Sequence, residues 1–128
     1  MPKEVKITLP TFSYSGKKKL YLNLNQYRNW HYSVNSNVKR NYSLAIQDKL
    51  DFSFNGEISI HYDYYAPDKR VRDLMNVVSV VDKFFQDAMV VRGCILADDT
   101  SIVKNISVCY LGIDRSNSRI EATVREVL

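Results

Sequence analysis

Cysteine, histidine and long apolar runs are all scarce in this chain. Its only two cysteines, Cys94 and Cys109, do not form a CxxC pair, and each sits among apolar neighbours. We therefore expect two buried free thiols in a reducing compartment rather than a disulfide. The only two histidines, His31 and His61, lie far apart in sequence, so a structural zinc site is not expected either.

Hydrophobic segments of membrane length are also missing. No apolar run approaches the roughly 18 residues that a membrane-spanning helix needs. Residues 1–6 lack the apolar stretch of a secretion signal. These absences predict a cytoplasmic protein without a membrane partner.

The chain has enough apolar residues to build a core. It has 128 residues, of which 45% are hydrophobic, so we expect one folded domain spanning 1–128 and little disorder. It carries 18 basic and 14 acidic residues, and the resulting net charge of +4 is too weak to identify a partner by itself.

The basic residues gather in short clusters, and between residues 17 and 42 they alternate with tyrosine and tryptophan. Cations that neutralise phosphates, beside aromatics that stack on exposed bases, suit a nucleic-acid surface. A solvated basic face over ordinary core aromatics explains the pattern equally well. The clusters contain Lys17, Lys18, Lys19, Arg28, Lys39, Arg40, Lys69, Arg70 and Arg72.

Hydrophobic periodicity predicts an α+β fold. The predicted elements are a strand at 4–9, a loop at 11–33, a helix at 37–50, a strand at 57–65, a helix at 74–91, and strands at 101–111 and 119–127. The order β-α-β-α-β-β favours one mixed sheet with two main helices packed on it. We expect the last two strands to form a hairpin, and the long loop at 11–33 to be functional.

Three aspartates stand at the ends of predicted elements. Asp73 opens the central helix, where it serves equally well as a helix cap or as a metal ligand. Asp98 and Asp99 follow an apolar stretch, and two adjacent acids repel each other unless solvent or a cation screens them. A surface turn would explain this pair, but a shared site for all three acids would hold Mg²⁺ for phosphodiester hydrolysis. That scheme is common to many nucleases.

A family resemblance strengthens the nuclease interpretation. Residues 67–76 read Pro-Asp-Lys-Arg-Val-Arg-Asp-Leu-Met-Asn, and an amphipathic helix and then Leu-Ala-Asp-Asp at 96–99 follow them. In this order the elements resemble the RusA family of Holliday-junction resolvases. Ile-Thr-Leu-Pro at 7–10 and Asn-Gln-Tyr-Arg at 25–28 also resemble that family, so the likeness spans most of the chain.

The resemblance implies a homodimer that binds four-way junctions or other branched DNA and makes paired, Mg²⁺-dependent nicks in recombination and repair. Mn²⁺ is the expected substitute for Mg²⁺. Family members are common in phages and prophages of bacterial hosts. By matching position, Asp73 and Asp99 resemble metal-binding aspartates of the family, and Asp98 is a neighbour that we expect to share this role.

One expected carboxylate is missing. Where the family usually reads Asp-Leu-Asp-Asn, this chain has Met75 in the third position. A thioether is a poor ligand for Mg²⁺, which prefers hard oxygen. Asp63, Asp68 and Asp82 are the candidates to replace it, and the sequence does not choose between them.

The segment between Asp73 and the Asp-Asp pair is about one helical turn longer than in the family pattern. If the extra turn lies early, Lys83 and Asp87 resemble the ends of the family's Lys-x-x-x-Asp-Ala-Leu, and Lys83 is a catalytic or phosphate-contacting lysine. If it lies later, Ser79 takes that position. An exposed lysine on an amphipathic helix is the plain alternative for Lys83.

These observations lead to one main hypothesis and two rivals. In the main hypothesis a metal ion activates water against a DNA phosphate, Lys83 stabilises the developing charge, and basic residues grip the DNA arms. The first rival is a catalytically impaired branched-DNA-binding protein of the same fold, weakened by Met75. The second is a structural protein whose acids are only cap and turn residues. The expected DNA contacts are Lys17, Lys18, Lys19, Arg28, Lys69, Arg70 and Arg72.

Overall fold

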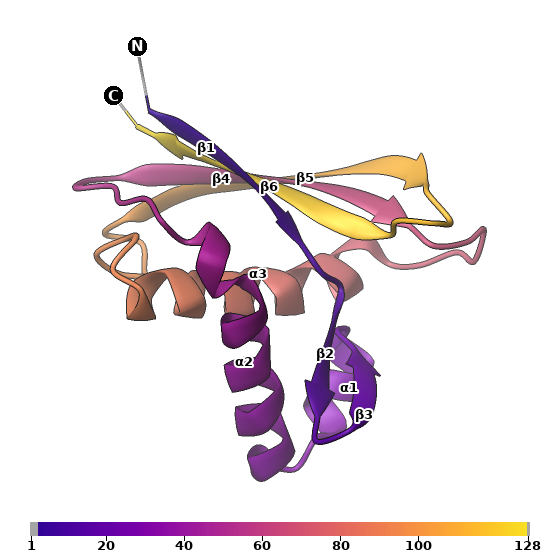
Figure 1. The fold of residues 1–128 in the computed structure, drawn as a ribbon. Helices are drawn as coiled ribbons and strands as arrows, with labels where there is room; N and C mark the ends of the chain where they lie inside the picture. Colours follow the sequence, from indigo (N-terminus) through magenta and orange to yellow (C-terminus); the bar gives the residue numbers. More distant parts are fainter. Residues whose placement is uncertain (1–2, 128) are drawn as a thin grey trace.

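A computed structural model describes residues 3–127 as one sheet covered on one face by helices, with a small hairpin beside them (Figure 1). Its mixed α and β content confirms the α+β class and the mixed sheet. The elements are β1 (Glu4–Leu9), β2 (Phe12–Ser15), β3 (Lys18–Tyr21), α1 (Leu24–Asn29), α2 (Tyr32–Ile46), the 3-10 turn η1 (Gln47–Lys49), β4 (Ile58–Ala66), α3 (Leu74–Val91), β5 (Val103–Ile113) and β6 (Arg119–Glu126).

The four-stranded sheet has the order β1-β6-β4-β5. Strand β6 pairs antiparallel with both β1 and β4, whereas β5 pairs parallel with β4 and forms an edge. Along β4, side chains alternate between buried and half-buried, so one face of the sheet meets the helices. The opposite face carries no helix (Figure 1).

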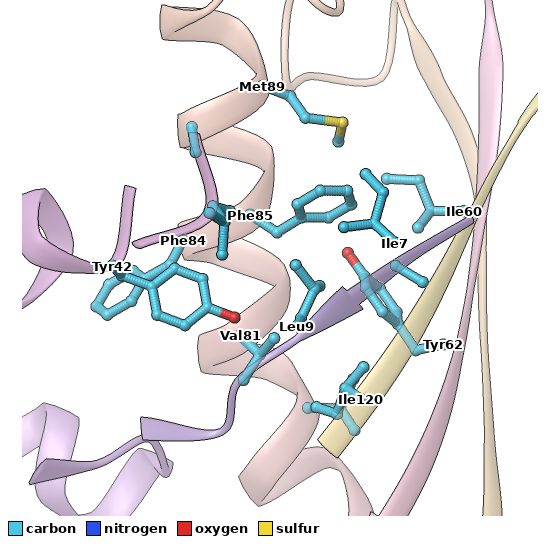
Figure 2. Close-up of a cluster of buried hydrophobic side chains, with 14 of the residues drawn as sticks. Ile7, Leu9, Tyr42, Ile60, Tyr62, Val81, Phe84, Phe85, Met89 and Ile120 are labelled. Atoms are coloured by element: carbon cyan, nitrogen blue, oxygen red, sulfur yellow. The ribbon is translucent and has the colours of Figure 1, made fainter. Parts of the chain in front are cut away.

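Helix α3 runs across the covered face and supplies more buried core residues than any other element. It begins after Asp73, as the sequence predicts, and ends before Gly93, whose positive φ of 77° is a conformation that favours glycine. Nine of its side chains are buried, among them Phe84, Phe85 and Met89. These pack against Leu9 and other strand residues (Figure 2). The ends of α3 are therefore held in fixed positions.

The predicted loop at 11–33 is wrong in most of its length. It contains β2, β3, α1 and the start of α2. The sequence did not reveal the two strands, because short strands rich in lysine show little hydrophobic alternation. The helix predicted at 37–50 begins earlier, at Tyr32, where the His31 ring accepts a hydrogen bond from the Ser33 N–H. Histidine is not among the favoured N-cap residues, so the sequence did not indicate that the helix begins here.

The predicted hairpin of the last two strands is also wrong. Strand β4 lies between β5 and β6, and residues 114–118 cross over it instead of closing a tight turn. Cys94 is buried as expected, but Cys109 is exposed on the edge strand, which corrects the expectation of two buried thiols. Within residues 3–127, no helix combines the length and apolar character needed to cross a membrane.

Candidate functional site at the two ends of helix α3

The three predicted aspartates lie at opposite ends of α3. Asp73 is the N-cap of the helix, and its carboxylate accepts a hydrogen bond of 3.1 Å from the Met75 N–H. One carboxylate oxygen is thus already used in holding the first turn together. The side chain of Asp73 is otherwise exposed to solvent.

At the other end of α3, Asp98 lies against Asp87. The carboxyl group of Asp98 lies close to that of Asp87, and this proximity, together with partial desolvation, raises the pKa of Asp98 above its ordinary value of 3.8. Two neighbouring carboxylates repel each other, so each is more easily ionised when a cation lies nearby.

Lys39 of α2 is the cation closest to this pair. Its Nζ lies 2.8 Å from Asp87 Oδ2, and the Asp87 side chain is only 19% exposed. This oxygen nevertheless makes no hydrogen bond of good geometry. Lys39 thus neutralises part of the charge on Asp87.

The segment after α3 folds back along the helix because it is anchored in the core. Cys94 and Ile95 are buried, and the Cys94 N–H donates to Met89 O while Cys94 O accepts from the Phe54 N–H. This return path sets Asp98 beside Asp87. The apolar residues that precede the Asp-Asp pair in the sequence indicated that this segment is anchored in the core.

Asp99 faces a different environment from Asp98. Its carboxylate accepts hydrogen bonds from both the N–H (2.9 Å) and the hydroxyl of Ser101, and these bonds lower its pKa below 3.8. The Asp99 carbonyl accepts from the Ile102 and Val103 N–H groups at the start of β5. Asp99 therefore forms the turn that the sequence offered as an alternative, and it remains ionised and exposed.

One chain does not bring the two groups of acids together. Fourteen residues of helix separate Asp73 from Asp87, which corresponds to about 21 Å along the axis. A single Mg²⁺ binds oxygens at about 2.1 Å and cannot join groups so far apart. Within residues 3–127, no cluster of three or more His, Cys, Asp or Glu side chains is arranged to hold a metal ion. The shared site of Asp73, Asp98 and Asp99 is thus not formed inside one chain.

The three candidates to replace the carboxylate missing at Met75 lie in different parts of the fold. Asp63 lies on the helix-free face of the sheet, bonded to His61. Asp82 faces the core, where it accepts hydrogen bonds from the Tyr62 hydroxyl and from Gln86. Only Asp68 belongs to the loop that leads to Asp73. It accepts from the Arg70 N–H and pairs with Arg72 at 2.8 Å, which lowers its pKa.

Lys83 and Ser79, the two alternatives for the family lysine, differ in accessibility. Lys83 is exposed on α3, one turn before Asp87, so its chain can extend toward the Asp87–Asp98 pair. Ser79 Oγ is buried and has no hydrogen-bond partner among the described residues. The accessible position one turn from the acid pair is therefore that of Lys83.

The predicted DNA-contacting residues form two groups. Lys69, Arg70 and Arg72 lie in the loop just before Asp73, and Arg72 is engaged with Asp68. The other group belongs to the β2–β3 hairpin and to α1, the helix that packs on α3. In the hairpin, Lys19 Nζ lies 4.1 Å from the centre of the Phe12 ring, so this cation is held beside an aromatic surface. The second group comprises Lys17, Lys18, Lys19 and Arg28.

Comparison with known proteins adds no family assignment. No family model matches the chain, and no curated protein sequence matches it. The likeness to RusA-type resolvases therefore rests on the motif residues alone. The sequence did not assign a role to Asp87, although it lies within a motif that resembles the family's. Its position on a helix turn between Phe84 and Ala88, both buried, was the available signal.

Proposed function

We propose that this chain is an Mg²⁺-dependent endodeoxyribonuclease that nicks branched DNA, such as four-way junctions. The observation that carries the proposal is the contact between the Asp87 and Asp98 carboxyl groups. Such a pair suits a divalent cation, because the cation would offset the repulsion that raises the pKa of Asp98. Mn²⁺ would support the same chemistry.

Each residue near the pair has a role in this proposal. Asp87 and Asp98 would hold the ion, and Asp99, the next residue along the chain, would add an ionised carboxylate nearby. Bound Mg²⁺ would polarise the scissile phosphate and activate water. Lys83 and Lys39 face the negative charge that develops on the phosphate oxygens. These two lysines would also offset the repulsion between the acids and DNA.

A second copy of the chain would complete the site. Because about 21 Å separates Asp73 from Asp87 along α3, Asp73 would meet Asp98 and Asp99 only across an interface between two copies. Two-fold symmetry would then create two equal sites, as paired nicking requires. The apolar side chains at both ends of α3 support this arrangement. Val71 and Met75 beside Asp73 are 96% and 49% exposed, and Val91 and Leu96 before Asp98 are 79% and 65% exposed.

In this arrangement Met75 has an explanation. Exposed apolar side chains tend to mark interaction surfaces when several lie together. Met75 would contribute contact area between the copies rather than a metal ligand. Lys69 and Arg70 would approach the second copy's site and bind the DNA backbone beside it.

A binding protein that no longer cuts DNA is the second candidate. It is favoured by the lack of a three-ligand metal cluster within residues 3–127 and by Met75 in place of the usual aspartate. This protein would bind four-way junctions through the same basic residues. It would show no Mg²⁺-dependent nicking at any protein concentration.

A junction-cleavage assay distinguishes the two candidates. The purified chain is mixed with a labelled four-way junction in Mg²⁺ or in EDTA, and both binding and nicking are measured. The nuclease proposal predicts nicks in Mg²⁺ that EDTA prevents. Binding without nicks in either Mg²⁺ or Mn²⁺ would favour the second candidate, and absence of both binding and nicking would contradict the two together.

A further inference from the structure

A serine, a histidine and an aspartate form a hydrogen-bonded chain on the helix-free face of the sheet, far from α3. The Ser107 hydroxyl lies 2.6 Å from His61 Nδ1, and His61 Nε2 lies 2.8 Å from Asp63 Oδ1. His61 and Asp63 are two residues apart on β4, and Ser107 is directly opposite His61 on β5. All three therefore stand on a rigid sheet rather than on a loop.

The contacts select one tautomer of the neutral His61 ring. An ionised carboxylate only accepts hydrogen bonds, so the neutral ring carries its proton on Nε2 and donates it to Asp63. Nδ1 is then the acceptor, and it takes the hydrogen bond from the Ser107 hydroxyl. This is the arrangement in which a histidine acts as a general base toward a serine while a carboxylate orients the ring.

The triad opens into a depression of about 460 Å³, a volume that suits a small ligand. The His61 side chain is 40% exposed, so a ligand can reach it from solvent. Lys6 and Asn105 line the same depression and offer hydrogen-bond donors to a developing negative charge. A nucleophile, a base, an orienting acid and donors thus share one surface.

We propose that Ser107 is an activated nucleophile in a second site, one that hydrolyses small carboxylic esters. Ser107 Oγ bonds to the ester carbonyl carbon while its proton moves to His61 Nδ1. The carbonyl oxygen gains negative charge facing Lys6 and Asn105. When the carbonyl re-forms, the bond to the alcohol breaks, and the departing alcohol takes the proton from His61. The acyl group stays on Ser107.

Water completes the cycle. A water molecule attacks the acyl carbonyl and gives its proton to His61 Nδ1. The bond to Ser107 Oγ breaks, Oγ recovers the proton, and the carboxylic acid leaves. Asp63 is a positioning residue, since its carboxylate is hydrogen-bonded to His61 and would stabilise the imidazolium that forms in each half of the cycle.

The test uses p-nitrophenyl acetate with the full chain. Release of p-nitrophenolate is followed by absorbance, and the acetylated residue is found by peptide mass mapping. We expect the acetyl group on Ser107, and a fall of about 100-fold in the acylation rate for Ser107→Ala and His61→Gln. Ser36→Ala, at an exposed position on α2, is the matched control that keeps the wild-type rate. Each variant is first checked for folding by circular dichroism.

Two further measurements protect against unspecific acetylation. The assay is repeated in a Cys109→Ala background, because this exposed thiol lies two residues from Ser107. In Asp63→Asn, the midpoint of the rate–pH curve moves to lower pH, since no carboxylate stabilises the imidazolium. Acetylation of lysines without Ser107, or equal acylation of wild type and His61→Gln, overturns the proposal.

Discussion

The two ends of α3 use their acids in different ways. At the N-terminal end, Asp73 satisfies the backbone of the first helical turn, and its neighbour Asp68 is neutralised by Arg72. At the C-terminal end, Asp98 lies close to Asp87, the pKa of Asp98 is raised, and Asp87 forms an ion pair with Lys39. The first end is electrostatically satisfied within the chain, whereas the second favours an added cation.

This difference shows that acids in a resembling motif need not act together within one chain. Proximity in a motif follows the sequence, but α3 is a rigid rod whose length keeps its two ends apart. If Asp73 takes part in metal binding, it does so across two copies. The predictions below separate the two ends, beginning with the largest expected effect.

Removing a ligand at the C-terminal end should have the largest effect on cleavage. We expect Asp98→Asn to lower the rate of Mg²⁺-dependent junction nicking by about 100-fold or more, because a metal ion supplies several kcal/mol of transition-state stabilisation. The matched control is Asp48→Asn at an exposed acid of η1, which should cut at the wild-type rate. Equal nicking by all three proteins would contradict the metal site.

Substitutions at Asp73 separate its cap role from a ligand role. Asparagine caps helices about as well as aspartate, so Asp73→Asn should leave the unfolding midpoint unchanged while nicking falls by about tenfold or more. Asp73→Ala should lose nicking and also about 1 kcal/mol of unfolding free energy. Full nicking by Asp73→Asn would leave Asp73 with its structural role only.

Disrupting the apolar contact beside Asp98 should separate the copies. Leu96→Glu places a charge on a surface that we expect to be buried in a dimer, so light scattering should report single chains and nicking should fall with it. Leu44→Glu on α2, at a side chain that is 54% exposed, is the matched control. If light scattering gives Leu96→Glu the same molar mass as the wild type, this surface does not belong to the proposed interface.

The acid pair should also alter the dependence of stability on pH and metal. The folded chain holds a proton on Asp98 at pH values where the unfolded chain has lost it. In EDTA, this pair's contribution to the unfolding free energy should therefore decrease as the pH rises above 3.8. Asp98→Asn should remove that decrease. At neutral pH, Mn²⁺ should raise the melting temperature of the wild type but not of Asp98→Asn.

Asp68 and Asp114 should change the unfolding free energy with pH in the opposite direction to Asp98. The pKa values of Asp68 and Asp114 are lowered by hydrogen bonds and nearby arginines, so their contribution to stability is present above 3.8 and is lost as the pH falls through the lowered values. Subtracting the Asp98→Asn curve from the wild-type curve isolates the acid pair. A difference curve without any pH dependence would contradict the raised pKa.

Parts of the fold that depend on local pattern could be predicted from the sequence. Helix α3 was predicted with its observed bounds, because apolar residues recur at three- and four-residue intervals between Asp73 and Gly93. Strand β4 was predicted within a residue at each end, with His61 and Asp63 on its second face. In each case the signal lies within the element itself.

Features that depend on distant contacts could not be predicted. Nothing local shows that β4 inserts between β5 and β6, because strand pairing is decided by the whole fold rather than by sequence order. The contact between Asp87 and Asp98 depends in the same way on the return path anchored by Cys94. The motif identified Asp98 but grouped it with Asp73, since a motif does not say whether two acids meet within one chain or across two copies.

Mixing two inactive variants tests most directly whether the ends of α3 meet across copies. Asp73→Asn and Asp98→Asn chains are unfolded together, refolded as a mixture and assayed for Mg²⁺-dependent nicking. In a mixed dimer, one of the two sites would contain both substitutions and the other would contain neither. We therefore predict that the mixture nicks faster than either variant alone. A mixture as inactive as its components, with mixed dimers shown to form, would contradict the account.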